Sequence, residues 1–187
     1  MHDRLSASYA ERLMACPGSA DLEVSIPGFQ YPVVDEEKGA KGKGHLWHAA
    51  LETIVGSTTP GELHNFIRAL EYVAELRASR RFKVLTEATV EIPWLATKPK
   101  TTVDLILYTQ DELHILDYKT GKIPVGAFNN AQLLYYAAAW LHLAPKAKTV
   151  LLHIVQPWAD NIDTWMVTRK RVSEFISELK DAEKEIL

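Results

Sequence analysis

The chain has 187 residues, 47% of them hydrophobic and 24% charged, and a formal net charge of −3. These values are typical of a globular protein, and the length favours one domain, residues 1–187, with a sizeable hydrophobic core. The single cysteine, Cys16, excludes an intrachain disulfide and an iron–sulfur cluster held by cysteines of one chain alone. No apolar run approaches the length of a membrane span, and no basic start followed by an apolar segment marks a secretory signal. We therefore expect a cytoplasmic protein, in which any contact with nucleic acid comes from a local patch because the chain is slightly acidic overall.

The N-terminal residues 6–24 are expected to form a helical segment. Ser8, followed by Glu11 three residues later, has the pattern of a capping box. Arg12 lies on this helix and is a candidate for contacting a phosphate group, although an arginine on a helix surface is the commoner case.

Residues 25–44 are predicted to form a connector, because prolines and glycines recur there. Lys43 is one of several lysines that alternate with glycines in this stretch. Such a sequence either contacts a phosphate backbone or is only a solvated connector. Residues 45–55 then take on a helical period, with His48 and Glu52 spaced four apart on one face.

A longer helix at residues 61–80 and a strand at residues 83–92 are predicted next. The helix follows from apolar residues at helical spacing, and the strand follows from strict alternation. The alternation assigns one face of the strand to Val84, Thr86, Ala88, Val90 and Ile92. Glu87 and Glu91 lie on the other face, where one of them either leans toward acidic residues of a neighbouring strand or simply faces solvent.

The centre of the chain, residues 101–119, is predicted to form a β-hairpin. Two short runs rich in Val, Ile, Leu and Tyr flank a polar break that lacks glycine. A break of this kind favours a four-residue loop around a type I turn over a tight two-residue turn. A symmetric loop places Tyr108 opposite Leu113 and Asp104 opposite Asp117.

This register brings two carboxylates together. Directly opposed carboxylates repel each other, and burying them without a partner is costly. A divalent cation such as Mg²⁺ between Asp104 and Asp117 removes the conflict, because hard cations take oxygen ligands. Lys119 lies two residues beyond Asp117 and so on the same face of the strand, whereas Tyr118 points the other way. The alternative is that an Asp near a strand end is a turn residue and that the Asp-x-Lys sequence forms a surface ion pair.

The C-terminal third is predicted to contain a helix, two strands and a last helix. Asn129 or Asn130 can cap a helix that runs to about Leu143, and Gln132 and Tyr136 share one face of it. The elements that follow are strands at residues 149–156 and 163–168 and a helix at residues 170–187. The core of the domain is expected to span about residues 45–157. The remaining histidines show no motif spacing and are expected to be structural: His2, His64, His114, His142 and His153.

Four short motifs occur along the chain in a fixed order. They are Gly44-x-x-x-His48, Val103-Asp104, Leu116-Asp-Tyr-Lys119 and Gln132-Leu-Leu-Tyr-Tyr136. In this order they resemble the motifs of the PD-(D/E)XK nuclease superfamily, specifically its RecB-like exonuclease branch. The segment from Ser8 to Pro17 is similar to phage-borne, stand-alone members of that branch. The resemblance implies an α/β fold with a restriction-endonuclease-like core, in which a mixed central sheet is flanked by helices.

The resemblance also implies a role for each motif residue. The ligands of Mg²⁺ or Mn²⁺ would be His48, Asp104 and Asp117, together with the carbonyl group of Tyr118. Lys119 would be the catalytic lysine. Glu87 would be an accessory acid. The residues expected to support the site or contact substrate are Gln132, Tyr136, Lys43 and Arg12.

These expectations describe a divalent-metal-dependent deoxyribonuclease, an exonuclease that hydrolyses phosphodiester bonds at DNA ends in replication, repair or recombination. The alternatives are a structure- or sequence-selective endonuclease, a DNA-binding or assembly protein without turnover, and a small-molecule enzyme in which the hairpin is only a core ladder. The expected partners are DNA, a divalent metal, and either another copy of the chain or a recombination protein, with no membrane partner. For a phage-encoded protein the compartment would be the host cytoplasm. The chain departs from the family pattern in having Thr102 where glycine is usual, and it lacks the four cysteines of relatives that hold an iron–sulfur cluster.

Overall fold

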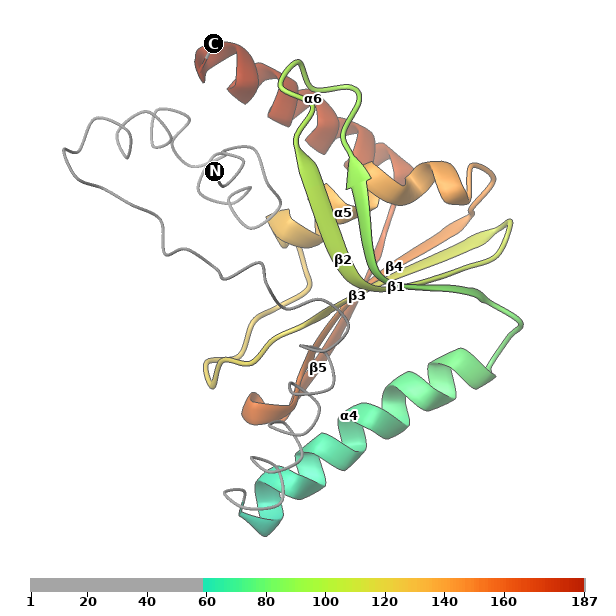
Figure 1. The fold of residues 1–187 in the computed structure, drawn as a ribbon, viewed down its shortest axis with the longest axis vertical. Helices are drawn as coiled ribbons and strands as arrows, with labels where there is room; N and C mark the ends of the chain where they lie inside the picture. Colours follow the sequence, from blue (N-terminus) through green and yellow to red (C-terminus); the bar gives the residue numbers. More distant parts are fainter. Residues whose placement is uncertain (1–58, 187) are drawn as a thin grey trace, which may run out of the picture.

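The computed structural model describes residues 59–186. They form a five-stranded mixed sheet flanked by three α-helices, an α/β architecture consistent with a restriction-endonuclease-like core (Figure 1). The helices are α4 (Pro60–Ala78), α5 (Ala131–Trp140) and α6 (Arg169–Ile186). The strands are β1 (Lys83–Glu91), β2 (Lys100–Tyr108), β3 (Glu112–Tyr118), β4 (Thr149–Gln156) and β5 (Asn161–Val167). Short 3-10 helices, η2 (Leu141–Leu143) and η3 (Pro157–Ala159), follow α5 and β4.

The predictions for the N-terminal third lie outside the described residues. They are the helical segment 6–24, the connector 25–44 and the helix 45–55, with the candidate site residues Arg12, Lys43 and His48. None of the helices in residues 59–186 combines the length and the apolar character of a membrane span.

The strands follow each other across the sheet in chain order, β1-β2-β3-β4-β5. Within the described sheet only β3 and β4 pair in parallel, and the connection between them contains α5. A parallel pair requires a crossover of this kind, whereas the antiparallel pairs are joined by shorter loops. The predicted strand at residues 149–156 is confirmed as β4, which lies between β3 and β5 inside the sheet.

The hairpin of β2 and β3 has the predicted register. Tyr108 pairs with Leu113 and Leu105 pairs with Leu116, so the loop is symmetric as the polar break indicated. The loop is closed by a bond of 2.8 Å from the Thr109 amide to the Glu112 carbonyl. This register decides where the acidic residues of both strands lie.

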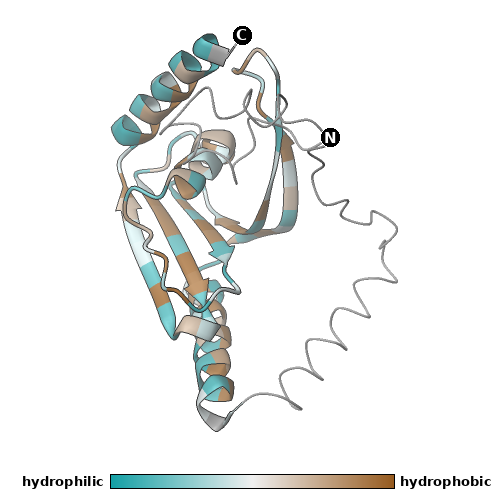
Figure 2. Cartoon of the chain, turned by 90° about the vertical axis from the view of Figure 1, so that its left-hand side faces the viewer, coloured by the Kyte–Doolittle hydropathy of each residue, from teal (hydrophilic) through white to brown (hydrophobic). Residues whose placement is uncertain are grey.

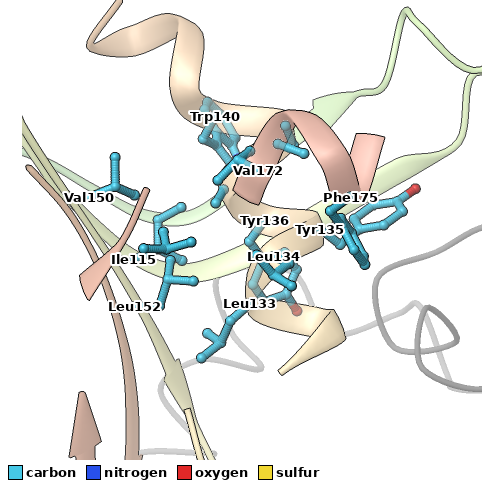
Figure 3. Close-up of a cluster of buried hydrophobic side chains, with 14 of the residues drawn as sticks. Ile115, Leu133, Leu134, Tyr135, Tyr136, Trp140, Val150, Leu152, Val172 and Phe175 are labelled. Atoms are coloured by element: carbon cyan, nitrogen blue, oxygen red, sulfur yellow. The ribbon is translucent and has the colours of Figure 1, made fainter. Parts of the chain in front are cut away.

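Helices cover both faces of the sheet. α4 begins at a capping box, in which Thr59 and Glu62 each accept a hydrogen bond from the other's backbone amide, and its Ala69 packs on one face of the sheet. The other face is covered by α5, which is almost entirely buried beneath the amphipathic α6 (Figure 1). Figure 2 shows hydrophobic bands along the central strands between these layers. Figure 3 shows the larger core, in which side chains of β3, β4, α5 and α6 meet: Ile115, Val150, Leu152, Leu133, Leu134, Tyr135, Tyr136, Trp140, Val172 and Phe175.

The predicted face assignment of β1 is wrong, because the alternation inverts within the strand. Leu85 packs on the same core as Ala88 and Val90, although an unbroken strand would put Leu85 on the opposite side. Between them, Glu87 adopts a left-handed conformation with φ 48°. The pairing of β1 with β2 continues on both sides of Glu87 but omits the step at which Glu87 would face Asp104. A single residue with unusual backbone angles therefore swaps the inward and outward faces.

Candidate active site

The site lies at the C-terminal end of β3. Asp117 and Lys119 point to the same face, where the Lys119 ammonium group lies 2.8 Å from Oδ2 of Asp117. Asp117 is 4% exposed, and the side chain of Lys119 is about one quarter exposed. Tyr118 between them points to the opposite face, toward α4. These directions confirm the prediction made from strand alternation and exclude the alternative of a surface ion pair, since Asp117 is buried.

Asp104 joins this group from β2. The last paired step of the hairpin at this end is Leu105 with Leu116, so Asp104 and Asp117 occupy the next step. Here the backbone ladder is replaced by a side chain, because Oδ2 of Asp104 accepts a hydrogen bond of 2.6 Å from the backbone amide of Tyr118. This bond fixes the Asp104 carboxylate against the end of β3.

Both carboxylates are less acidic than ordinary aspartates. Burial raises the pKa of Asp117, and the negative charge of Asp104 raises it further, against the opposing effect of Lys119. Burial also raises the pKa of Asp104, while the amide of Tyr118 and the charge of Lys119 oppose the increase. The repulsion expected from two facing carboxylates is therefore present at Asp117, although its effect on the pKa is smaller than that of burial or of Lys119.

Helix α5 supplies the third side of the site. The side chain of Asn130 caps the helix by accepting a bond of 3.1 Å from the amide of Leu133, as the sequence predicts for one of the two asparagines. One turn of this helix then presents Gln132 and Tyr136 on the same face. The Gln132 carbonyl oxygen accepts a bond of 2.5 Å from the Lys119 ammonium group, and the Gln132 amide nitrogen donates one of 2.7 Å to the Tyr136 hydroxyl. The predicted pair is thus connected to the predicted lysine.

The Tyr136 hydroxyl remains protonated at neutral pH. Burial raises its pKa to about 12, the bond from Gln132 opposes the increase, and the charges of Asp117, Asp104 and Glu87 add to it. A protonated hydroxyl that already accepts from Gln132 can still donate its own hydrogen. Tyr136 therefore orients Gln132, and within residues 59–186 no acceptor takes its hydroxyl hydrogen, which can be donated to a bound group.

Glu87 lies at the edge of this site. In the β1–β2 register it occupies the row of Asp104, and its charge reaches both Tyr118 and Tyr136. A left-handed glutamate costs roughly 1–2 kcal/mol relative to an ordinary strand residue. Glu91 instead pairs with Lys100 farther along the strand. Of the two candidate glutamates, only Glu87 has the register to join the aspartates.

The described residues fit a Mg²⁺ or Mn²⁺ ion only in part. Nowhere in residues 59–186 do three or more His, Cys, Asp or Glu side chains meet as a metal-binding group. The half-buried Asp104 and the buried Asp117 nevertheless provide oxygen donors whose mutual repulsion a cation would relieve. Mg²⁺ is commonly held by one or two carboxylates, with water and substrate phosphates completing its shell, so the donor set is suitable.

The sequence did not predict a second polar cluster, which is buried in the sheet. His114 and His153 stack with their rings 5.2 Å apart, and His114 Nδ1 lies 3.0 Å from His153 Nε2. The chain continues from His153 Nδ1 to the Tyr72 hydroxyl at 2.7 Å and from His114 Nε2 to Glu112 at 3.1 Å. Because β3 and β4 are parallel, their register brings together histidines that are far apart in sequence. The sequence alone did not indicate that β3 and β4 pair in this register, so it could not predict the contact between the two histidines.

Residues 58–186 match the model of the family described as a protein of unknown function, DUF2800. The chain belongs to this family. The matched region includes the site residues Asp104, Asp117, Lys119, Gln132 and Tyr136. Among solved structures, the chain is similar to one titled "Crystal structure of SSO0001", with 16% sequence identity over 78% of this chain and 69% of that chain. The TM-score of 0.37 is too low for this likeness to bear on fold or activity.

Proposed function

We propose that this member of the DUF2800 family is a divalent-metal-dependent deoxyribonuclease, most simply an exonuclease that acts on DNA ends in replication, repair or recombination. The observation that carries the proposal is the network of Asp117, Lys119, Gln132 and Tyr136, which Asp104 joins through the backbone amide of Tyr118. These residues come from β2, the end of β3 and α5, and all five are among those that the resemblance to PD-(D/E)XK nucleases assigns to the site.

Lys119 has a suitable position for stabilising a phosphoryl group. An ammonium group has three N–H donors, and within the described residues two of them are directed to Asp117 and Gln132. The third is left for an oxygen of the scissile phosphate or for the attacking water. A fixed positive charge where negative charge develops is the most effective kind of electrostatic stabilisation in a partly buried site.

The two aspartates supply the oxygen donors that phosphodiester hydrolysis by this route requires. Asp104 and Asp117 would hold Mg²⁺ or Mn²⁺, with His48 and the Tyr118 carbonyl as the further ligands that the resemblance implies. Such an ion, when bound, lowers the pKa of a coordinated water and polarises the phosphate. The chain itself contributes the position of both carboxylates, through the bond from the Tyr118 amide and the ion pair with Lys119.

The proposal is tested by incubating linear single- and double-stranded DNA with the protein in Mg²⁺, Mn²⁺ or EDTA. We expect metal-dependent loss of DNA that falls by at least about a hundredfold in Lys119→Ala. Lys184→Ala is the matched control, because it removes the same charge from an exposed lysine near the end of α6. A covalently closed circle separates the two nuclease modes, since an exonuclease leaves it intact.

Two results would contradict this function. One is the absence of cleavage by folded wild-type protein under every metal, and the other is equal activity of wild type and Lys119→Ala. Metal-independent DNA binding without any cleavage would favour a DNA-binding or assembly protein instead.

A further inference from the structure

A cavity of about 520 Å³ lies on the face of the sheet opposite to Asp117. It opens between α4, the end of β3 and η3, and its wall includes the side of β3 that carries Tyr118. Of the proposed catalytic network, Lys119 alone borders it. Its lining residues are Phe66, Ala69, Leu70, Val73, Ala74, Arg77, Tyr118, Lys119, Thr120, Val155, Pro157 and Trp158.

The cavity is apolar and aromatic. Phe66 of α4 and Trp158 of η3 meet edge to face, with their ring centroids 5.7 Å apart. Tyr118 is 45% exposed and Leu70 is 60% exposed, so large apolar groups face an open space. Exposed aromatic rings next to a hollow of this volume form a suitable site for a flat ring, because ligand pockets commonly measure 300–1,000 Å³.

The two charged residues that line the cavity are both basic. Arg77 and Lys119 contribute to its wall, and none of the described residues that line it is acidic. Arg77 acts electrostatically on the Tyr118 hydroxyl, which also feels the negative charges of Asp104 and Glu87 from the neighbouring site. A ligand that matches this surface has both a planar apolar part and a negative charge.

The cavity is directly connected to the proposed site through the backbone. Tyr118 is the residue between Asp117 and Lys119, so one side of the strand faces the aspartates and the other faces the cavity. A chain molecule that places a ring on Tyr118 can place its neighbouring phosphate beside Lys119. A second copy of the protein or an apolar peptide would not need the cations.

We propose that this cavity binds an unstacked base of a single-stranded nucleic acid, with the adjoining phosphate between Arg77 and Lys119. The inference rests on the proposed nuclease function and deepens it, because it assigns the substrate as a single-stranded or frayed DNA end. Aromatic side chains that stack on bases and cations that follow the backbone are the two features of sequence-tolerant single-strand binding.

The test compares two fluorescent oligothymidylates, one complete and one with abasic positions, in EDTA so that no metal-dependent cleavage occurs. Wild type should bind the complete strand about tenfold more tightly or better, since stacking on an aromatic ring discriminates by this order. Trp158→Ala should bind the complete strand more weakly and lose this discrimination. Phe128→Ala is the control, because Phe128 is 72% exposed and does not line the cavity.

Leu70→Glu and Arg77→Glu test the same surface without removing a packed aromatic ring. Both positions are exposed, so their folding can be checked by thermal unfolding while their affinity for the complete strand should fall. Equal binding of complete and abasic strands by wild type would overturn the inference. A wild type that is dimeric in solution while Trp158→Ala is monomeric would also overturn it, because a second copy of the chain would then occupy the cavity.

The outcomes for the nuclease and for the cavity are distinguishable. Discrimination between the two strands that depends on Trp158, with no cleavage in any metal, would support base binding and contradict the nuclease. Cleavage that depends on Lys119, with Trp158→Ala binding and cutting like wild type, would support the nuclease and contradict base binding.

Discussion

The stacked histidine pair predicts an acid-sensitive fold. Burial and, to a smaller extent, the neighbouring His114 lower the pKa of His153 to about 3. In the unfolded chain a histidine has a pKa near 6.5. Below that value the unfolded state binds a proton that the folded state excludes. The contribution of the neutral His153 to the free energy of unfolding is therefore complete above pH 6.5 and is lost progressively as the pH falls toward 3. At pH 5 the solution lies about 1.5 pH units below the pKa of an unfolded histidine. Excluding the proton from His153 in the folded state then costs roughly 2 kcal/mol of stability.

The hydrogen bonds around the pair explain why protonation is unfavourable. If His114 donates Nε2–H to Glu112, its Nδ1 accepts from His153 Nε2–H, and His153 Nδ1 then accepts from the Tyr72 hydroxyl. With both rings neutral, the contacts from His114 Nδ1 through His153 to the Tyr72 hydroxyl each join one donor to one acceptor. A proton on His153 Nδ1 would remove one acceptor of the Tyr72 hydroxyl, which also lies 3.0 Å from Thr164 Oγ1, and would place a charge beside a second imidazole.

Urea unfolding followed by circular dichroism at pH 7, 6 and 5 measures this effect. Wild type should lose roughly 2 kcal/mol more than His153→Gln between pH 7 and pH 5, because glutamine keeps hydrogen-bonding groups but does not titrate. The exposed His142→Gln serves as the control and should follow wild type. Equal losses in wild type and His153→Gln would refute the assignment of acid sensitivity to this residue.

The site itself gives two further predictions. Asp104→Asn keeps an acceptor for the Tyr118 amide but removes one of two repelling charges, so the metal-free protein should become more stable by about 0.2–1 kcal/mol while a thermal shift on adding Mn²⁺ disappears. A loss of stability greater than 1 kcal/mol would argue against repulsion. At Glu87, glycine tolerates the left-handed backbone and should leave stability nearly unchanged, whereas Glu87→Val should cost about 1–2 kcal/mol in denaturant unfolding. Equal stability of the two Glu87 variants would show that the left-handed angle carries no strain.

Much of the site was predictable because it depends on local rules. The hairpin register followed from a polar break without glycine, and this register alone placed Asp104 beside Asp117. Alternation along one strand placed Lys119 on the same face, and helical spacing joined Gln132 to Tyr136. Each of these inferences uses a period or a turn that the backbone imposes within a few residues.

The features that the sequence did not reveal depend on contacts between distant segments. The histidine chain requires the parallel register of β3 and β4, which no pattern in either strand specifies. The cavity likewise requires η3 to bring Trp158 against Phe66 of α4. Exposed apolar residues at helical spacing on α4 predicted a helix but not which of its faces would remain open.

The predicted face assignment of β1 fails next to the proposed active site. Strict alternation fails at Glu87, and at that row the β1–β2 pairing omits Asp104. On the other side of β2, the row is also where the hairpin ladder ends and the Asp104 side chain accepts the Tyr118 amide in place of a backbone carbonyl. In a regular sheet the backbone would continue to pair across this row. Here the Asp104 carboxylate accepts the Tyr118 amide instead, while the hairpin register keeps Asp104 beside Asp117. The departure from ideal strand geometry at Glu87 therefore lies in the same row as the acidic pair, and strain of this kind is expected where function requires it.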